Sequence, residues 1–160
     1  MHKLTIIAVL ATAPVAGGCG GGSDKILTKA EVIKRGAAIC KAAEKRVSSL
    51  PQPTVEHPFA KGTSPAEHAR ARRFLTGYAD ALEFSRAGLA KLKAPEQDRE
   101  LLDGYLRDTA AIVAELRTAS KAPAPDVEAK ANDAFARFEK ASSQTKKYGF
   151  PKGVCQSGGS

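Results

Sequence analysis

The side chains with the widest chemical range in this 160-residue chain are three cysteines and three histidines. A thiol can be acylated, oxidised to a disulfide or bound to a metal, and an imidazole can act as a base or a metal ligand. The compartment and the surrounding elements decide which of these chemistries applies. The residues concerned are Cys19, Cys40, Cys155, His2, His57 and His68.

The histidines are not spaced like metal or haem ligands. Neither the Glu-x-x-His pattern of di-iron bundles nor the Cys-x-x-Cys-His pattern of covalent haem occurs. No serine has a Gly-x-Ser-x-Gly surrounding, and no phosphate-binding glycine loop is present. We therefore expect no metal, no cofactor and no enzymatic activity, with His57 and His68 structural or solvated.

Residues 1–18 are typical of an export signal. His2 and Lys3 form a short basic start, and Leu4 to Ala16 is a nearly uncharged apolar run. A membrane-spanning helix needs about 20 apolar residues, so this run is too short. Removal of the segment takes away Lys3 and no acid, which lowers the net charge from +8 to +7.

The residues that end this segment, Ala16-Gly17-Gly18-Cys19, resemble the lipobox of bacterial lipoproteins. The resemblance implies cleavage before Cys19, a thioether-linked lipid on its sulfur, acyl chains such as palmitate, and a place outside the cytoplasm on the cell membrane. Ala16 is a departure, because leucine is frequent at that position, and ordinary signal cleavage near Ala16 or Gly18 is the alternative. Residues 19–26, rich in glycine and serine, predict a flexible tether.

Four amphipathic segments predict an all-α domain over residues 27–149, with a tail over 150–160. Capping-box patterns begin the first two helices at Thr28 and Ser64, and Gly149 is a typical C-terminal cap. Short connections favour an up-down four-helix bundle, with a three-helix core and a peripheral N-terminal helix as the alternative. The predicted helices cover 27–49, 64–92, 96–120 and 125–148, and the first is expected to bury Ile33, Ala37, Cys40 and Val47.

Two cysteines remain in the domain once Cys19 is lipidated, and in an oxidising compartment they predict one disulfide. Cys40 lies about 18 Å along the first helix at about 1.5 Å per residue. Cys155 follows Gly149 by six residues, enough for about 20 Å of extended chain. The tail can therefore fold back to Cys40; the alternative is a buried free Cys40 and a frayed Cys155.

Basic residues gather where predicted helices end. Cations there oppose the negative end of the helix dipole, which is one interpretation. The other is a contact with anionic lipid or a cell-wall polymer, because the bundle brings these ends to the anchored side. Nucleic acid is not expected as a partner, since no groove-reading motif occurs. The candidate contacts are Lys91, Lys93, Lys146, Lys147 and Lys152.

The longest irregular stretch of the domain is Pro51–Thr63, which the bundle topology places at the end away from the membrane. It carries Val55, His57 and Phe59, and long connections of this kind are often functional. These three residues are candidate contacts for a protein partner. The alternative is a lid that packs Phe59 onto the end of the bundle.

The layout also resembles a group of predicted actinobacterial lipoproteins of unknown function. The matching features are Cys19-Gly-Gly-Gly-Ser-Asp24, Leu27-Thr28-Lys29-Ala30-Glu31, Ile39-Cys40, and Tyr148-Gly149-Phe150 before Cys155. They cover the two ends of the chain. The resemblance implies export, lipidation and a helical fold, and it brings no activity and no site.

Three functions follow as hypotheses. The first is a non-enzymatic, surface-tethered binding or interaction module, and the second is a carrier that holds a small apolar ligand between the helices. A void lined by leucine and phenylalanine favours the carrier, whereas a filled Ala/Leu core favours the module. The third is a cell-envelope hydrolase, which requires His57 or His68 beside an acid and a serine.

The leader and Cys19 generate a direct prediction. Protein isolated from its native membrane should begin at residue 19 and carry the mass of a thioether-linked lipid with acyl chains, as measured by intact mass spectrometry. Cys19→Ser should abolish the added mass and release the protein from the membrane fraction, because a single polypeptide tether has no apolar surface to hold it there. Retention of Met1 in the wild-type product would contradict the assignment.

Overall fold

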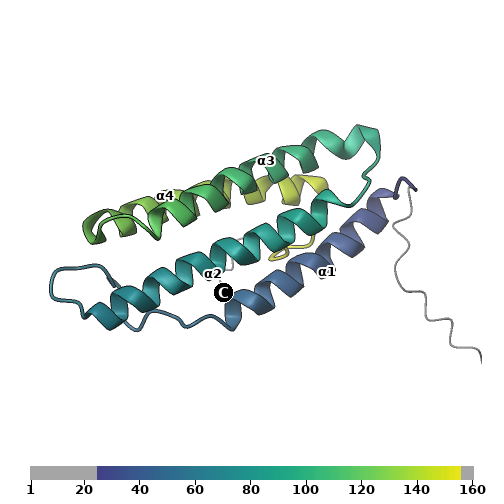
Figure 1. Cartoon of the computed structure of the whole chain (residues 1–160). Helices are drawn as coiled ribbons and strands as arrows, with labels where there is room; N and C mark the ends of the chain where they lie inside the picture. Colours follow the sequence, from purple (N-terminus) through teal and green to yellow (C-terminus); the bar gives the residue numbers. More distant parts are fainter. Residues whose placement is uncertain (1–24, 156–160) are drawn as a thin grey trace, which may run out of the picture.

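The computed structural model describes residues 25–155, which form four helices that run alternately up and down (Figure 1). The described residues contain no strand. The predicted all-α, up-down four-helix bundle is therefore confirmed. Residues 1–24, with the predicted leader, Cys19 and most of the tether, lie outside the described residues. The helices are α1 (Lys29–Ser48), α2 (Pro65–Ala90), α3 (Glu96–Ala119) and α4 (Ala124–Tyr148).

Capping residues determine where α1 begins and where α4 ends. The Thr28 hydroxyl accepts a hydrogen bond from the Glu31 amide, and the Glu31 carboxylate accepts one from the Thr28 amide at 2.8 Å, so the predicted capping box is confirmed. Gly149 ends α4 with φ of +110°, in the left-handed region. The amides of Gly149 and Phe150 both donate to the Thr145 carbonyl, and Phe150 is buried.

The second predicted capping box is half wrong. The Ser64 hydroxyl does accept from the Glu67 amide at 3.2 Å. The Glu67 carboxylate, however, turns away from Ser64 and accepts hydrogen bonds from the amide and hydroxyl of Thr54. These bonds, first that of the Thr54 amide, lower the pKa of Glu67. The buried acid thus holds the start of the 51–63 connection against α2.

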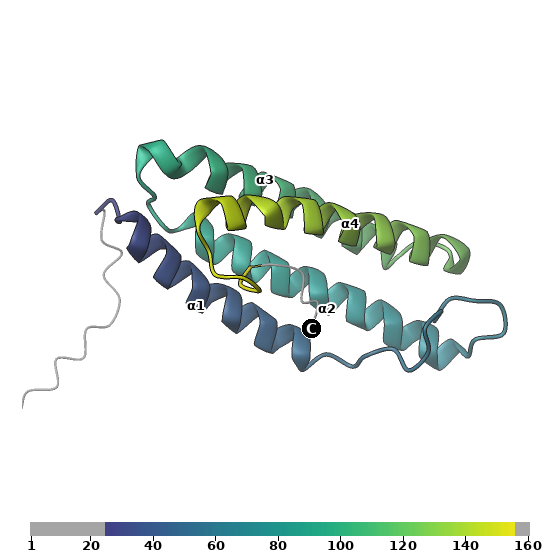
Figure 2. The same cartoon turned by 180° about the vertical axis from the view of Figure 1, so that it is seen from behind.

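Neighbouring helices in the sequence pack against one another, α1 on α2, α2 on α3 and α3 on α4. α1 and α4 make little direct contact, and a seam separates them where the bundle would otherwise close (Figure 2). The core lies mainly between α2, α3 and α4. Its largest fully buried side chains include Tyr105, Tyr148, Leu89, Ile112 and Leu116.

The buried face of α1 differs from the predicted one. Cys40 is buried as expected, but Ile33, Ala37 and Val47 are only half-buried. The fully buried positions are Val32, Gly36, Cys40 and Ala43. The reason is the tail: a Cβ at Gly36 would lie 2.7 Å from the ring of Phe150, so glycine leaves the space in which that ring packs.

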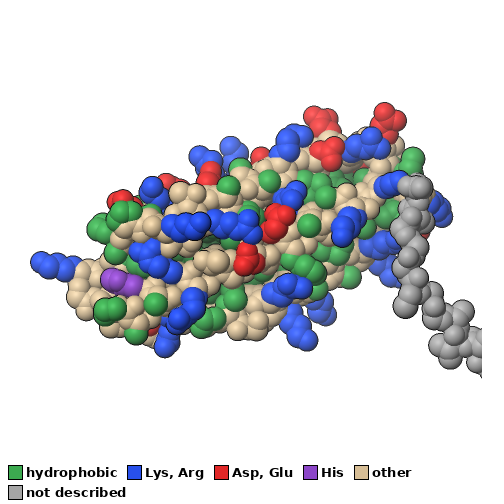
Figure 3. Space-filling view, in the orientation of Figure 1, with side chains coloured by type: hydrophobic (Ala, Val, Ile, Leu, Met, Phe, Trp, Pro, Cys, Tyr) green, Lys and Arg blue, Asp and Glu red, His purple; other side chains and the backbone are tan. Residues whose placement is uncertain are grey.

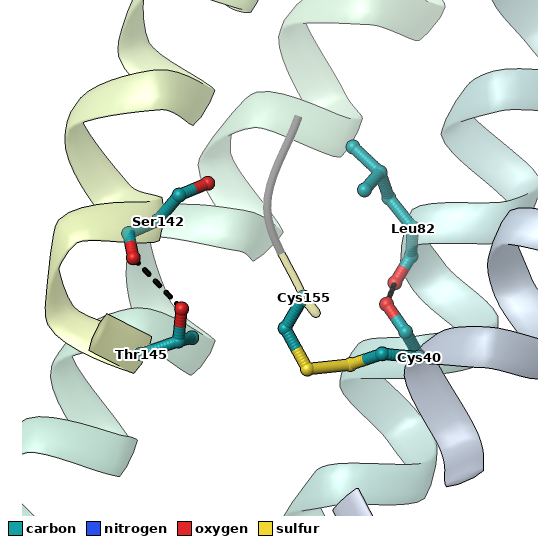
Figure 4. The surroundings of a disulfide bond; sticks show 6 residues. Cys40, Leu82, Ser142, Thr145 and Cys155 are labelled. Carbon is teal, nitrogen blue, oxygen red and sulfur yellow. Dashed lines mark hydrogen bonds between the residues drawn. A yellow bond between two sulfur atoms is a disulfide. The ribbon is translucent and has the colours of Figure 1, made fainter. Parts of the chain in front are cut away.

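The segment after α4 fills part of the seam. It turns back over α2, and Cys155 forms a disulfide with Cys40, with a Cα–Cα distance of 5.1 Å. Figure 4 shows the bridge between Leu82 of α2 on one side and Ser142 and Thr145 of α4 on the other. The predicted pairing and the folded-back tail are confirmed, and residues 150–155 belong to the packed fold because Phe150 and Cys155 are buried.

This bridge should dominate the stability of the bundle. It joins residues 115 apart, and the loop-entropy model assigns a closure of that length about 4–5 kcal/mol. We expect a reductant to lower the free energy of unfolding by roughly that amount in guanidinium titrations. The Cys40→Ser/Cys155→Ser variant should already have the lower value and show no response to the reductant. Equal stability with and without reductant in the wild type would contradict this.

Candidate functional site

The part of the seam that residues 150–155 leave open is a groove of about 900 Å³. α1 and α4 form its two walls, α2 forms its floor, and the disulfide with the tail closes one end. It extends along α1 from Cys40 to Ser48, which corresponds to about 12 Å of helix. Most of its exposed lining is apolar. The wall and floor residues include Ala43, Val47, Phe74, Tyr78, Ala81, Leu82, Tyr105, Phe135 and Phe138.

Aromatic rings shape the floor of the groove. The ring of Tyr78 meets that of Phe135 edge-on, with centroids 5.2 Å apart, and lies 5.9 Å from that of Phe74. All three side chains are half-buried, so their rings still face the open space. Burial raises the pKa of Tyr78 to about 12, and that of Tyr105 likewise to about 12. Both phenols are therefore neutral at pH 7, and the floor carries no charge.

Charged side chains occur only around the rim of the groove. Glu44 comes from α1, Glu139 from α4 and Lys152 from the tail. None of the three forms an ion pair within residues 25–155. A molecule with an apolar body can thus lie on the aromatic floor while a polar end reaches a charge at the rim.

The groove does not bring together the residues of a hydrolase. Its serines are Ser48 and Ser85, and each donates its hydroxyl to a carbonyl of its own helix, at 2.9 Å to Lys45 and 2.8 Å to Leu82. No histidine lines it. Such back-bonded hydroxyls are satisfied within the helix, which is a structural role.

The 51–63 connection lies at the end of the bundle opposite residue 25, as predicted (Figure 1). Of its three candidate contact residues, Val55 is exposed and His57 is exposed, but Phe59 is buried. The ring of Phe59 packs 5.5 Å from that of His68, and the Arg72 guanidinium lies over it. Phe59 is therefore not available to a partner, and it forms the lid that was the alternative.

His57 fastens this lid to α4. Its Nδ1 lies 2.6 Å from a carboxylate oxygen of Glu128; the His57 side chain is exposed to solvent and that of Glu128 is half-buried. The hydrogen bond that the imidazolium donates to the Glu128 carboxylate, followed by the charge of that carboxylate, raises the pKa of His57. The other imidazole differs, because Nε2 of His68 is buried without a hydrogen-bond partner in the described chain.

The candidate lysines divide into two groups. Lys91 and Lys93 follow α2, and Lys146 and Lys147 end α4, so all four lie at the end where the described chain begins. Lys152 does not lie with them, because the tail folds back and places it on the groove. Its expected place at the anchored end is therefore wrong, whereas its contact with an anionic surface stays a prediction.

Residues 25–155 contain no group of three or more His, Cys, Asp and Glu side chains arranged to hold a metal ion. Within the same range, no helix combines the length and the apolar character needed to cross a membrane.

No protein-family model matches the chain, and no curated protein or solved structure shows significant similarity to it.

The His57–Glu128 pair predicts a pH-dependent lid. The pKa of His57 in the folded chain lies above its value in the unfolded chain, near 6.5. The pair therefore stabilises the lid fully below about pH 6.5, and this stabilisation is lost as the pH rises through the raised pKa. Glu128→Gln should lower the His57 pKa measured by NMR titration more than Glu56→Gln, since Glu56 acts only through its charge. An identical pKa in both variants would contradict the pairing.

Proposed function

We propose that this chain is a lipid-anchored protein on the extracytoplasmic face of the membrane, and that it binds a small apolar ligand in the α1–α4 groove without transforming it. The leader and Cys19 support the location, as does the Cys40–Cys155 disulfide, which is compatible with an oxidising compartment. The resemblance to predicted actinobacterial lipoproteins agrees with the proposed location only and brings no activity.

The single observation that carries the binding role is the groove itself. Its volume of about 900 Å³ lies within the range of small-molecule sites, roughly 300–1,000 Å³. An apolar opening of this size between the helices of residues 25–155 exposes aromatic surface that tight packing would otherwise bury. A ligand that covers the rings of Phe74, Tyr78 and Phe135 would gain this burial.

The shape of the groove defines the ligand further. A length of about 12 Å suits a compact molecule rather than a fully extended long acyl chain. The rings favour a planar or branched apolar body, and the rim charges favour a polar group at one end. An interaction module is the second candidate function, because the groove opens along one side, where apolar side chains of a protein partner could enter.

The test uses a chain that begins at residue 20, which keeps residues 25–155 and cannot carry a lipid on Cys19. N-phenyl-1-naphthylamine, an apolar dye that fluoresces when shielded from water, serves as the probe. The wild type should bind it saturably. Val47→Trp, which fills the groove from the α1 wall, should weaken binding by about tenfold or more, and Phe135→Ala by about threefold to tenfold.

Phe84→Ala is the matched control. Phe84 on α2 is half-buried, as Phe135 on α4 is. The ring of Phe84, however, lies under the Arg46 guanidinium and does not line the groove. This variant should bind the dye as the wild type does. Equal losses in the groove and control variants would reject the groove as the site, and no saturable binding by the wild type would reject the carrier function. Circular dichroism and an intact disulfide establish that each variant is folded.

A further inference from the structure

We propose that the end of the bundle at which the described chain begins is a docking surface for an anionic lipid bilayer. We call this surface the basic end and define it by Lys25, Ile26, Lys91, Lys146 and Lys147. It is separate from the groove and does not depend on the ligand proposed for it. It also acts independently of the lipid on Cys19.

The fold brings these residues together from distant parts of the sequence. The Leu27 amide donates to the Lys93 carbonyl at 2.8 Å, which joins the start of the described chain to the α2–α3 connection. The Lys29 ammonium lies 5.1 Å from the centre of the Tyr148 ring, which joins the start of α1 to the end of α4. Lysines beside these three elements therefore share one end of the molecule.

Charge at this end is predominantly positive and accessible. Lys25, Lys91, Lys146 and Lys147 are exposed. Of the acids nearby, Asp98 is paired with Lys29 at 2.9 Å, and Glu31 is engaged in the Thr28 cap. Glu96 and Glu100 lie in the first turns of α3, and Figure 3 shows acidic side chains at that edge with basic ones beside and below them. The exposed lysines of the basic end therefore attract anionic headgroups.

Ile26 distinguishes a bilayer from a soluble polyanion. It is 60% exposed, and Val55, at the far end of the bundle, is the other large hydrophobic residue found exposed in residues 25–155. An apolar side chain within a group of lysines is the composition of a peripheral membrane contact, where it enters the interface while the ammonium groups meet headgroups. A phosphate-rich wall polymer has no apolar region in which such a side chain could be buried. The helix dipole explains lysines at helix ends, but it does not explain an exposed isoleucine among them.

The test again uses the chain from residue 20, with co-sedimentation on phosphatidylcholine vesicles with or without phosphatidylglycerol. The wild type should bind only the anionic vesicles, and binding should fall as salt is added. Lys91→Gln/Lys146→Gln/Lys147→Gln should lower the partition coefficient by about tenfold or more. Ile26→Ser should lower it by roughly tenfold, with the salt dependence unchanged.

The matched control is Lys61→Gln/Lys121→Gln/Lys130→Gln, which removes the same charge from exposed lysines at the opposite end of the bundle. It should bind nearly as the wild type does. An equal loss in both triple variants would show a general effect of net charge and overturn the proposal. Wild-type behaviour of Ile26→Ser, together with full competition by soluble polyphosphate, would assign the surface to a polyanion and also overturn it.

Discussion

The structure depends on the way the tail occupies the seam between the first and last helices. α1 packs on α2 but makes little contact with α4, so it would be held on one side only without the segment that follows Gly149. The Phe150 ring fits against Gly36, where any Cβ would collide with it, and Cys155 is bonded to Cys40 four residues further along. A hydrophobic contact and a covalent bond thus replace the missing helix interface.

The same arrangement explains why a groove exists. The described part of the tail ends at Cys155, which is bonded to Cys40, and beyond this point the described parts of α1 and α4 line the groove. Closure of the remaining seam would require large side chains on α1 that reach α4, but the α1 wall presents Ala43, Val47 and Ser48. The aromatic residues are on α2 and α4 instead. The groove therefore stays open because α1 carries small residues where α2 and α4 carry aromatic rings.

Features that a few adjacent residues determine could be predicted from the sequence. The Thr28–Glu31 cap, the Gly149 cap and the four helices all have short-range causes. The disulfide could be predicted because only reach and compartment had to be estimated. Features that depend on residues far away in the sequence could not be predicted in this way. Glu67 has the ordinary pattern of a helix cap, and nothing local indicates that its carboxylate binds Thr54 across the connection.

Two other errors have the same origin. The face of α1 was predicted from its own periodicity, but the ring of Phe150, more than a hundred residues away, decides that Gly36 is buried. The sequence places Lys152 near the helix-end lysines because it follows Gly149 by three residues, but the bond of Cys155 to the distant Cys40 turns this segment toward the groove. The sequence gives only a weak indication of the groove, namely that Phe74, Tyr78 and Phe135 share their helix faces with small residues.

The relative positions of the groove and the basic end constrain how a ligand would arrive. Cys40, at the closed end of the groove, lies eleven residues into α1 from Lys29, or about 17 Å along the helix. A bundle that stands on lipid headgroups through its basic end would hold the groove above the membrane surface, with the opening directed sideways. A ligand drawn straight from the bilayer would have to cross that distance through water. The geometry therefore favours a ligand with some aqueous solubility, or one delivered by a partner that meets the bundle from the side.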